Sequence, residues 1–259
     1  MNVLPIIEIQ RVPISMYGLM IVIGAFLGVY IGIKRSNKYH IEREDVIFSS
    51  CFAAIGLIIG AKLLYIITAI PTIIKHKDIV FSSFSKFKEL LSGGFVFYGG
   101  LIGAVIGFYI YSKQYKINII DLLDLMAPSI PLIHGFGRLG CFFAGCCYGI
   151  EYSGPFHIIF HKSLAAPNGI PLFPIQVLES GLNFIAFIIL LIYGRKLRSS
   201  GKLIGAYIVY YSIARFFLEF LRGDVARGIF WGISTSQWIS LPLLAIGILF
   251  ILGKIPKKD

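Results

Sequence analysis

The sequence predicts an all-α membrane protein that crosses the bilayer several times. Hydrophobic residues make up 57% of its 259 residues and charged residues only 14%, well below the roughly 25% of an ordinary soluble domain. The mean hydropathy is +0.82. A soluble fold of this length needs polar residues to cover its core, and this chain has too few of them. The same composition excludes disordered, collagen-like and small disulfide-rich chains.

Seven segments are apolar enough to be transmembrane helices, for which a bilayer requires roughly 20 residues. They are residues 16–33, 46–70, 94–111, 122–137, 175–193, 203–221 and 237–252. The fourth contains Pro128 and Pro131, which predict a broken helix packed against protein or a cavity. The first lacks a small-residue cleavage site and is followed directly by Lys34 and Arg35, so it does not resemble a cleaved signal peptide.

The basic residues predict the orientation of these segments. The net charge of +11 comes from lysines and arginines that cluster between apolar segments, which favours topology and lipid headgroup contact over nucleic-acid binding. One side holds thirteen of them in short loops and the tail: Lys34, Arg35, Lys38, Arg43, Lys113, Lys116, Arg195, Lys196, Arg198, Lys202, Lys254, Lys257 and Lys258. The N-terminus is therefore predicted outside and the C-terminus in the cytoplasm.

The chain shows no internal repeat and no low-complexity linker. Residues 1–259 are therefore predicted to form a single membrane-embedded domain. Its longer external segments, near 71–92 and 141–174, are where chemistry is expected.

Charged residues inside apolar segments are functional candidates, because burying them in a membrane is costly. Spacings of four and three predict that Arg215, Glu219 and Arg222 share one helix face. This face indicates either a structural ion pair or an anion site for a phospholipid headgroup, because guanidinium matches phosphate in a bidentate fork. Lys62 is expected to extend toward the membrane interface.

Arg138 stands in a glycine-rich stretch at the predicted end of the broken helix. Gly135, Gly137 and Gly140 permit close backbone approach, so a phosphate-binding role for Arg138 is favoured over a helix end closed by glycine at the interface. His134 is expected to be structural.

Three of the four cysteines, Cys141, Cys146 and Cys147, lie in one short stretch, which indicates a site rather than a disulfide framework. Zinc is disfavoured because the spacing departs from Cys-x-x-Cys, although His157 and His161 stand near enough in sequence to complete a set. No metal and no cofactor are predicted. The sequence before Cys146 is similar to a lipobox, but it lies well inside the chain, so a lipid-acceptor role is not expected.

Six motifs follow one another along most of the chain. They are YGLM at 17–20, GGFVFYGGLIG at 93–103, DLMAP at 124–128 running into HGFGRLG at 134–140, FPIQVLE at 173–179, RFFLE at 215–219 with Arg222 beyond, and SQWISLP at 236–242. Any one of them is a weak signal. Together, and in this order, they resemble the prolipoprotein diacylglyceryl transferase family.

The resemblance implies transfer of a diacylglyceryl group from phosphatidylglycerol to the lipobox cysteine thiol of a prolipoprotein, with a thioether formed and glycerol phosphate released. It implies a multi-pass protein of the bacterial plasma (inner) membrane, with its active site facing the outer leaflet. The implied partners are phosphatidylglycerol, prolipoprotein signal peptides with a lipobox, and membrane lipid. By position, the implied catalytic residues are Arg138, Arg215, Tyr98 and Glu219. The implied lipid-binding residues are Arg138, Tyr17, Gly99, Gly140, Gln176, Glu179 and Arg222.

The chain departs from the family pattern at four positions. Cys141 and Ala144 replace two asparagines, Cys146 replaces a glutamate, and Tyr98 replaces a histidine. A tyrosine with its ordinary pKa of about 10 is a poor base at pH 7, so Glu179 or Glu219 stays open as the proton acceptor. These departures keep two alternatives: a paralogue that transfers the lipid group to a different acceptor, and a non-catalytic lipid transporter or lipid-binding membrane protein.

Overall fold

The computed structural model describes residues 6–9, 12–75, 83, 94–163, 165–196, 201–224 and 228–254. They divide into two compact units: unit 1 comprises Met1–His40 with Leu123–Asp259, and unit 2 comprises Ile41–Leu122. Within the described residues, four helices are long and apolar enough to cross a membrane, or five if a bent helix pair counts as one span. The chain is thus an all-α, polytopic membrane protein, while the count of seven spans, the orientation and the single domain stay predictions.

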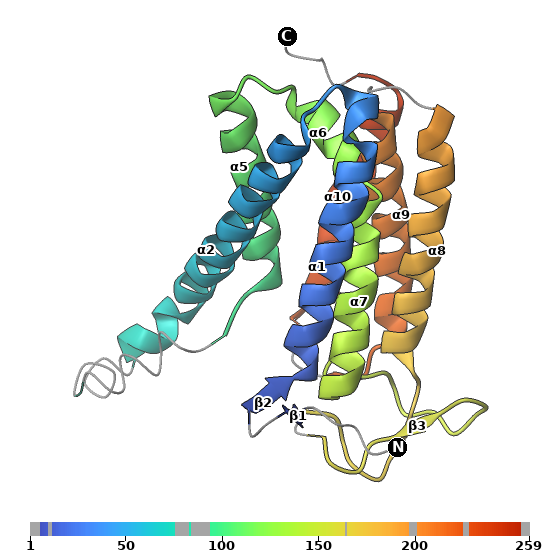
Figure 1. The fold of residues 1–259 in the computed structure, drawn as a ribbon. Coiled ribbons are helices and arrows are strands. Elements are labelled where there is room, and N and C mark those ends of the chain that lie inside the picture. The colour runs from blue at the N-terminus through green and yellow to red at the C-terminus, as the bar shows by residue number, and fades with distance from the viewer. Residues whose placement is uncertain are drawn as a thin grey trace. The chain divides into compact units, whose positions relative to one another are not determined.

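Unit 2 is built around α2 (Arg43–Lys75) and α5 (Phe97–Gln114), which pack side by side (Figure 1). Their contact is made of glycines: Gly56 and Gly60 on α2 face Gly99 and Gly103 on α5, and a Cβ added at any of them would collide with the opposite backbone. Small residues spaced four apart let membrane helices approach closely. At the far end of this contact, the Tyr111 hydroxyl donates to Asp45 Oδ1 at 2.8 Å.

The described residues of unit 1 form five long helices, which run side by side (Figure 1). They are α1 (Met16–Arg35), α7 (Ser129–Ala144), α8 (Ile175–Lys196), α9 (Lys202–Leu218) and α10 (Thr235–Ile251). Helix α7 packs against both α1 and α8, and α9 packs against α10. The order of contacts places α7, α8, α9 and α10 around a common interior, which becomes the candidate site.

The predicted helix break is confirmed. Helix α6 (Ile119–Met126) meets α7 at an angle of 47°, and the break falls just before Ser129, where Pro128 precedes the helix. Proline disfavours helical geometry in the residue before it, which accounts for the position of the break. The Ser129 hydroxyl then donates to the Gly28 carbonyl at 2.7 Å and fixes the start of α7 against α1.

Short elements close the ends of the bundle. Three two-stranded antiparallel ladders pair β1 (Ile6–Ile9) with β2 (Val12–Ser15), β3 (Ile158–Ile159) with β4 (Pro171–Leu172), and β5 (Ile229–Phe230) with β6 (Ile233–Ser234). Two 3-10 turns follow α1 and α9: η1 (Ser36–Tyr39) and η2 (Glu219–Leu221). The last turn of α7 and the segment after it share a small core of Phe142, Phe160, Ala166 and Leu172.

Asp124 is a buried acid that joins the ends of several helices in unit 1. It is 1% exposed, and its carboxylate accepts from the backbone N–H groups of Gly201 and Ile204, both at 2.9 Å, at the start of α9. Arg35 donates to the Asp124 carbonyl at 3.3 Å. A carboxylate at a helix N-terminus satisfies donors that have no partner within the helix.

The glycine contact in unit 2 predicts a large effect of added volume. Gly103→Ile is expected to lower the free energy of unfolding by about 1–3 kcal/mol, because the side chain has no room against Gly56. Thermal unfolding in detergent measures the change. Gly181→Ala is the control, since nothing lies within 4 Å of the added methyl group. Equal melting temperatures for the two variants would contradict the close helix contact.

Candidate functional site

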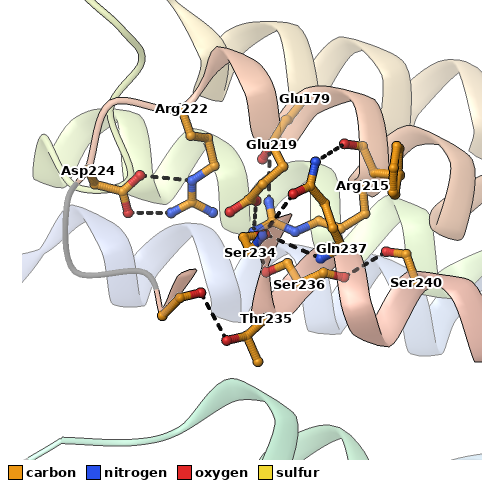
Figure 2. A network of polar contacts seen from close by, with 12 residues as sticks. Glu179, Arg215, Glu219, Arg222, Asp224, Ser234, Thr235, Ser236, Gln237 and Ser240 are labelled. Atoms are coloured by element: carbon orange, nitrogen blue, oxygen red, sulfur yellow. Dashed lines mark hydrogen bonds and ion pairs between the residues drawn. The ribbon is translucent and has the colours of Figure 1, made fainter. Parts of the chain in front are cut away.

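Four charged side chains form a continuous ion-pair chain inside unit 1. Arg138 pairs with Glu179, Glu179 Oε1 lies 3.4 Å from Arg215 Nη1, and Arg215 Nη2 lies 2.6 Å from Glu219 Oε2. Figure 2 shows Glu179 and Glu219 converging on Arg215. All four side chains are at most 11% exposed, so the chain of charges is buried in protein.

The position of Arg138 corrects the sequence prediction. The spacing indicated a helix that ends near Gly137, with Arg138 at its end. Instead α7 continues to Ala144 and ends at Gly145, whose φ of +67° is left-handed. The helix continues past Gly137 because glycine is tolerated inside a membrane helix where neighbouring helices pack closely. Arg138 therefore projects from the body of the helix, and its side chain is buried.

Glycines bring α7 close enough to its neighbours to form this site. Gly135 faces the ring of Phe184, and a Cβ there would lie 2.7 Å from that ring. The Ser180 hydroxyl donates to the Gly135 carbonyl at 3.0 Å. One turn further, Gly140 leaves room for Tyr17 of α1. Close packing of α7 on α8 therefore sets the distance from Arg138 to Glu179.

The predicted shared helix face holds for only two of its three residues. Arg215 and Glu219 form an ion pair across one turn, as their spacing predicts. Arg222 lies beyond the helix: α9 ends at Leu218, η2 follows, and Arg222 is extended with φ −89° and ψ 136°. Its guanidinium holds Asp224 in a bidentate pair, with Nε to Oδ1 at 2.9 Å and Nη2 to Oδ2 at 2.5 Å. The tightening of the last turn takes Arg222 off the common face.

Helix α10 supplies a partner that sequence reasoning missed. Ser236 Oγ accepts from Arg215 Nη2 at 3.0 Å. Ser234 and Gln237 form a capping box at the start of α10, and Gln237 Nε2 donates to the Phe216 carbonyl at 3.2 Å. Ser236 could have been found from the spacing of Ser234 and Gln237, which is typical of a capping box. A capping box fixes where a helix begins, and so fixes which residue of its first turn faces Arg215.

A small cavity lies beside the ion-pair chain. It has a volume of about 20 Å³, and its lining includes His134, Arg138, Glu179, Asn183, Tyr210, Tyr211 and Arg215. This is room for one or two water molecules. The His134 ring lies 6.0 Å from the Tyr211 ring. A phosphate group therefore needs a side chain to move before it reaches both arginines.

The charges of the ion-pair chain sum to zero, because it contains two guanidinium and two carboxylate groups. Glu179 contacts both arginines. Arg138 directs Nε toward Glu179 and Nη1 toward Cys141 Sγ at 3.9 Å. Its guanidinium therefore contacts both the carboxylate and the nearest cysteine.

The cysteines lie next to Arg138. The sulfur atoms of Cys141, Cys146 and Cys147 all lie within 4.8 Å of one another, and Gln176 Nε2 donates to the Cys146 carbonyl at 2.9 Å. Hydrogen bonds from Cys141 and Cys146, together with the positive charges of Arg138 and Arg222, lower the pKa of the Cys147 thiol. The substituted signature positions therefore border the arginine site.

The structure thus brings together Arg138, Glu179, Arg215 and Glu219. Tyr17 and Gly140 pack beside them, while Gln176 holds the loop after α7 in place. Tyr98 and Gly99 lie on α5 in unit 2, where Gly99 packs against Gly60. Catalytic and lipid-binding roles of all these residues, and of Arg222, stay predictions.

Comparisons with known proteins agree along almost the whole chain. A family model described as prolipoprotein diacylglyceryl transferase matches residues 5–253. Two clostridial relatives carry names of that kind. "Phosphatidylglycerol–prolipoprotein diacylglyceryl transferase 2" of Clostridium perfringens is 39% identical over 93% of this chain and 91% of its own length. The "Phosphatidylglycerol–prolipoprotein diacylglyceryl transferase" of Clostridium tetani is 40% identical over 93% of this chain and 93% of its own length. A Streptococcus pneumoniae transferase is 30% identical over 97% of this chain and 94% of its own.

The shared carboxylate predicts a specific loss of stability. Glu179→Gln removes the negative charge between two buried guanidinium groups and is expected to lower the free energy of unfolding by about 3 kcal/mol. Glu151→Gln removes an equal charge from an exposed position and is expected to change it by less than about 0.5 kcal/mol. Thermal unfolding in detergent compares the two. If both variants melt with the wild type, Glu179 does not hold the arginines.

Proposed function

The chain belongs to the prolipoprotein diacylglyceryl transferase family, and we propose that it transfers a diacylglyceryl group from phosphatidylglycerol to the lipobox cysteine of prolipoproteins. The observation that carries this proposal is the pair of buried arginines, Arg138 and Arg215, that share the carboxylate of Glu179. A phosphodiester accepts two parallel hydrogen bonds from each guanidinium fork, as a carboxylate does. Phosphate therefore competes directly with Glu179 for the same donors.

The reaction replaces a carbon–oxygen bond by a carbon–sulfur bond and moves one proton. The thiol sulfur attacks the glyceryl carbon that carries the phosphate, the carbon–oxygen bond to that phosphate breaks, and glycerol phosphate leaves as a thioether forms. The leaving group gains negative charge in the transition state. Arg138 and Arg215, held in place by protein and buried away from water, stabilise that charge more than solvent does.

We propose Glu179 as the proton acceptor of this site. The ion-pair chain without a ligand is neutral, and a bound phosphodiester takes the place of the Glu179 carboxylate on Arg138. The displaced carboxylate then accepts the thiol proton, and the thiolate that forms carries its negative charge to the glyceryl carbon. Glu219 stays paired with Arg215 and keeps that guanidinium oriented. Tyr17, which packs on Gly140 of α7, is proposed to line the path of the lipid. The catalytic role of Tyr98 in unit 2 stays a prediction.

The proposed location is the bacterial plasma membrane, with the site open to the outer leaflet. The chain is a multi-pass membrane protein. In unit 1, the cation-rich end contains Arg35 and Lys38, and Lys38 donates to the Arg195 carbonyl at 2.8 Å. Arg138 lies in the second half of α7, and that half packs at Gly140 against Tyr17, at the end of α1 opposite Arg35. Cations mark the cytoplasmic side, which supports an outward-facing site.

A different acceptor is the second candidate function. It is favoured by Cys141 and Cys146, which replace two polar residues of the family signature and lie beside Arg138. The lipid donor would be the same, because the arginines that contact it are retained.

Arginine geometry predicts the outcome of a charge-conserving substitution. Arg138→Lys keeps the charge but loses the fork, so transfer of lipid to a lipobox peptide from phosphatidylglycerol vesicles is expected to fall by about 100-fold. Arg195→Lys makes the same exchange at an exposed position and is expected to act like the wild type. Mass spectrometry of the peptide gives the rate. An unchanged rate in Arg138→Lys argues against phosphate binding at this residue.

A cell-based experiment separates the two acceptors. Expression of this chain in a host depleted of its own transferase is expected to restore lipidation of lipoproteins, measured by the mass of their N-terminal cysteine. Arg138→Ala is expected to restore none. If lipoproteins stay unmodified while another molecule gains a diacylglyceryl group, the different acceptor is correct.

A further inference from the structure

Three cysteine sulfurs converge where α7 ends. Cys141 lies in the last turn of α7, and Cys146 and Cys147 follow the helix. The left-handed Gly145, with φ +67°, reverses the chain, and Cys147 is also left-handed, with φ +53°. The Cys146 N–H donates to the Cys141 carbonyl at 3.1 Å and closes the turn. The three cysteines are unevenly spaced in the sequence, but every pair of their sulfur atoms lies within 4.8 Å.

The size of the cluster suits a metal ion. Zinc–sulfur bonds of about 2.3 Å in a tetrahedral shell place the sulfurs about 3.8 Å apart, so the three thiols need to approach by about 1 Å or less. Cys146 and Cys147 are half-buried and Cys141 is buried, so an ion enters from the side of Cys146 and Cys147. That open side also leaves a position for water as the fourth ligand.

The donor set selects a soft ion. Within the described residues, no carboxylate or imidazole joins the three sulfurs. His157, which the sequence brings near, is exposed, and its Nδ1 contacts the Gly154 carbonyl at 3.0 Å. Sulfur ligands alone favour ions such as Zn²⁺ and Cu⁺ over Mg²⁺ or Ca²⁺.

The surroundings stabilise the charge of a loaded cluster. Three thiolates and one Zn²⁺ carry a net charge of −1. Arg138 Nη1 lies 3.9 Å from Cys141 Sγ and places a positive charge at the edge of the cluster. The amide of Gln176 holds the Cys146 carbonyl at 2.9 Å, which fixes the loop that carries two of the ligands. An outer shell of this kind orients ligands and balances their charge.

We propose that Cys141, Cys146 and Cys147 form a binding site for a thiophilic metal ion, with Zn²⁺ and a water ligand as the form the geometry favours. A bound ion would clip the end of α7 to the loop that follows it. The site does not depend on the transfer reaction, because its ligands are sulfurs outside the ion-pair chain.

Metal binding by the full chain in detergent tests the proposal. Protein that has been reduced and freed of metal is titrated with Zn²⁺ and measured by elemental analysis, and with Cd²⁺, whose bonds to thiolate give an ultraviolet absorption band. One equivalent of each metal is expected for the wild type. Cys51→Ser, which removes the exposed cysteine of α2, is the matched control and is expected to bind equally.

Variants of the half-buried ligands keep the test independent of folding. Cys146→Ser and Cys147→Ser are expected to weaken Cd²⁺ binding at least about tenfold, since loss of even an outer-shell partner costs that much. The double variant is expected to show no thiolate band. Equal binding by wild type and double variant would overturn the proposal. So would a disulfide among the three cysteines that forms in air and persists in the presence of excess Zn²⁺.

Discussion

The ion pair between Arg138 and Glu179 is the contact on which the rest of the site depends. A guanidinium buried in a membrane bundle is costly unless a carboxylate and further acceptors surround it. Glu179 forms ion pairs with both arginines. Arg215 also pairs with Glu219 and donates a hydrogen bond to Ser236. Helices α7, α8, α9 and α10 therefore meet at one charged centre, and the position of each is constrained by the others.

Close helix packing is the condition for that centre. Gly135 lets α7 approach Phe184 of α8, and Gly140 lets it approach Tyr17 of α1. Larger residues at these positions would separate the helices and lengthen the path between Arg138 and Glu179. The glycines also leave little free volume, about 20 Å³ beside the charges. The site is thus preorganised around its own carboxylate, and a lipid phosphate gains access by replacing it.

Much of this charged centre could be predicted from the sequence, because a charged residue in an apolar segment must face the interior of the protein or a water-filled cavity. The spacing predicts that Arg215 and Glu219 share one helix face, with an ion pair and an anion site as the two interpretations, and in the structure they form an ion pair. The helix break at Pro128 was also predictable, since proline disfavours a helical residue before it. Family motifs indicated Arg138 and Glu179, but only the fold shows that one carboxylate serves both arginines.

The remaining features depend on tertiary structure that spacing does not encode. Arg222 left the predicted face because α9 tightens into a 3-10 turn before it. Helix α7 ran past Gly137 because packing against two neighbours outweighs the low helix propensity of glycine. The three cysteines met because Gly145 and Cys147 adopt left-handed backbone conformations, so that a spacing unlike that of common zinc sites still yields a cluster.

A crystal structure of the protein with phosphatidylglycerol, grown from a lipid mesophase, tests the central claim most directly. We expect the phosphate to lie within hydrogen-bond distance of both Arg138 and Arg215, with the Glu179 carboxylate turned away from Arg138. A phosphate bound elsewhere, with Glu179 still between the two arginines, would contradict the claim that this ion-pair chain is the lipid-phosphate site.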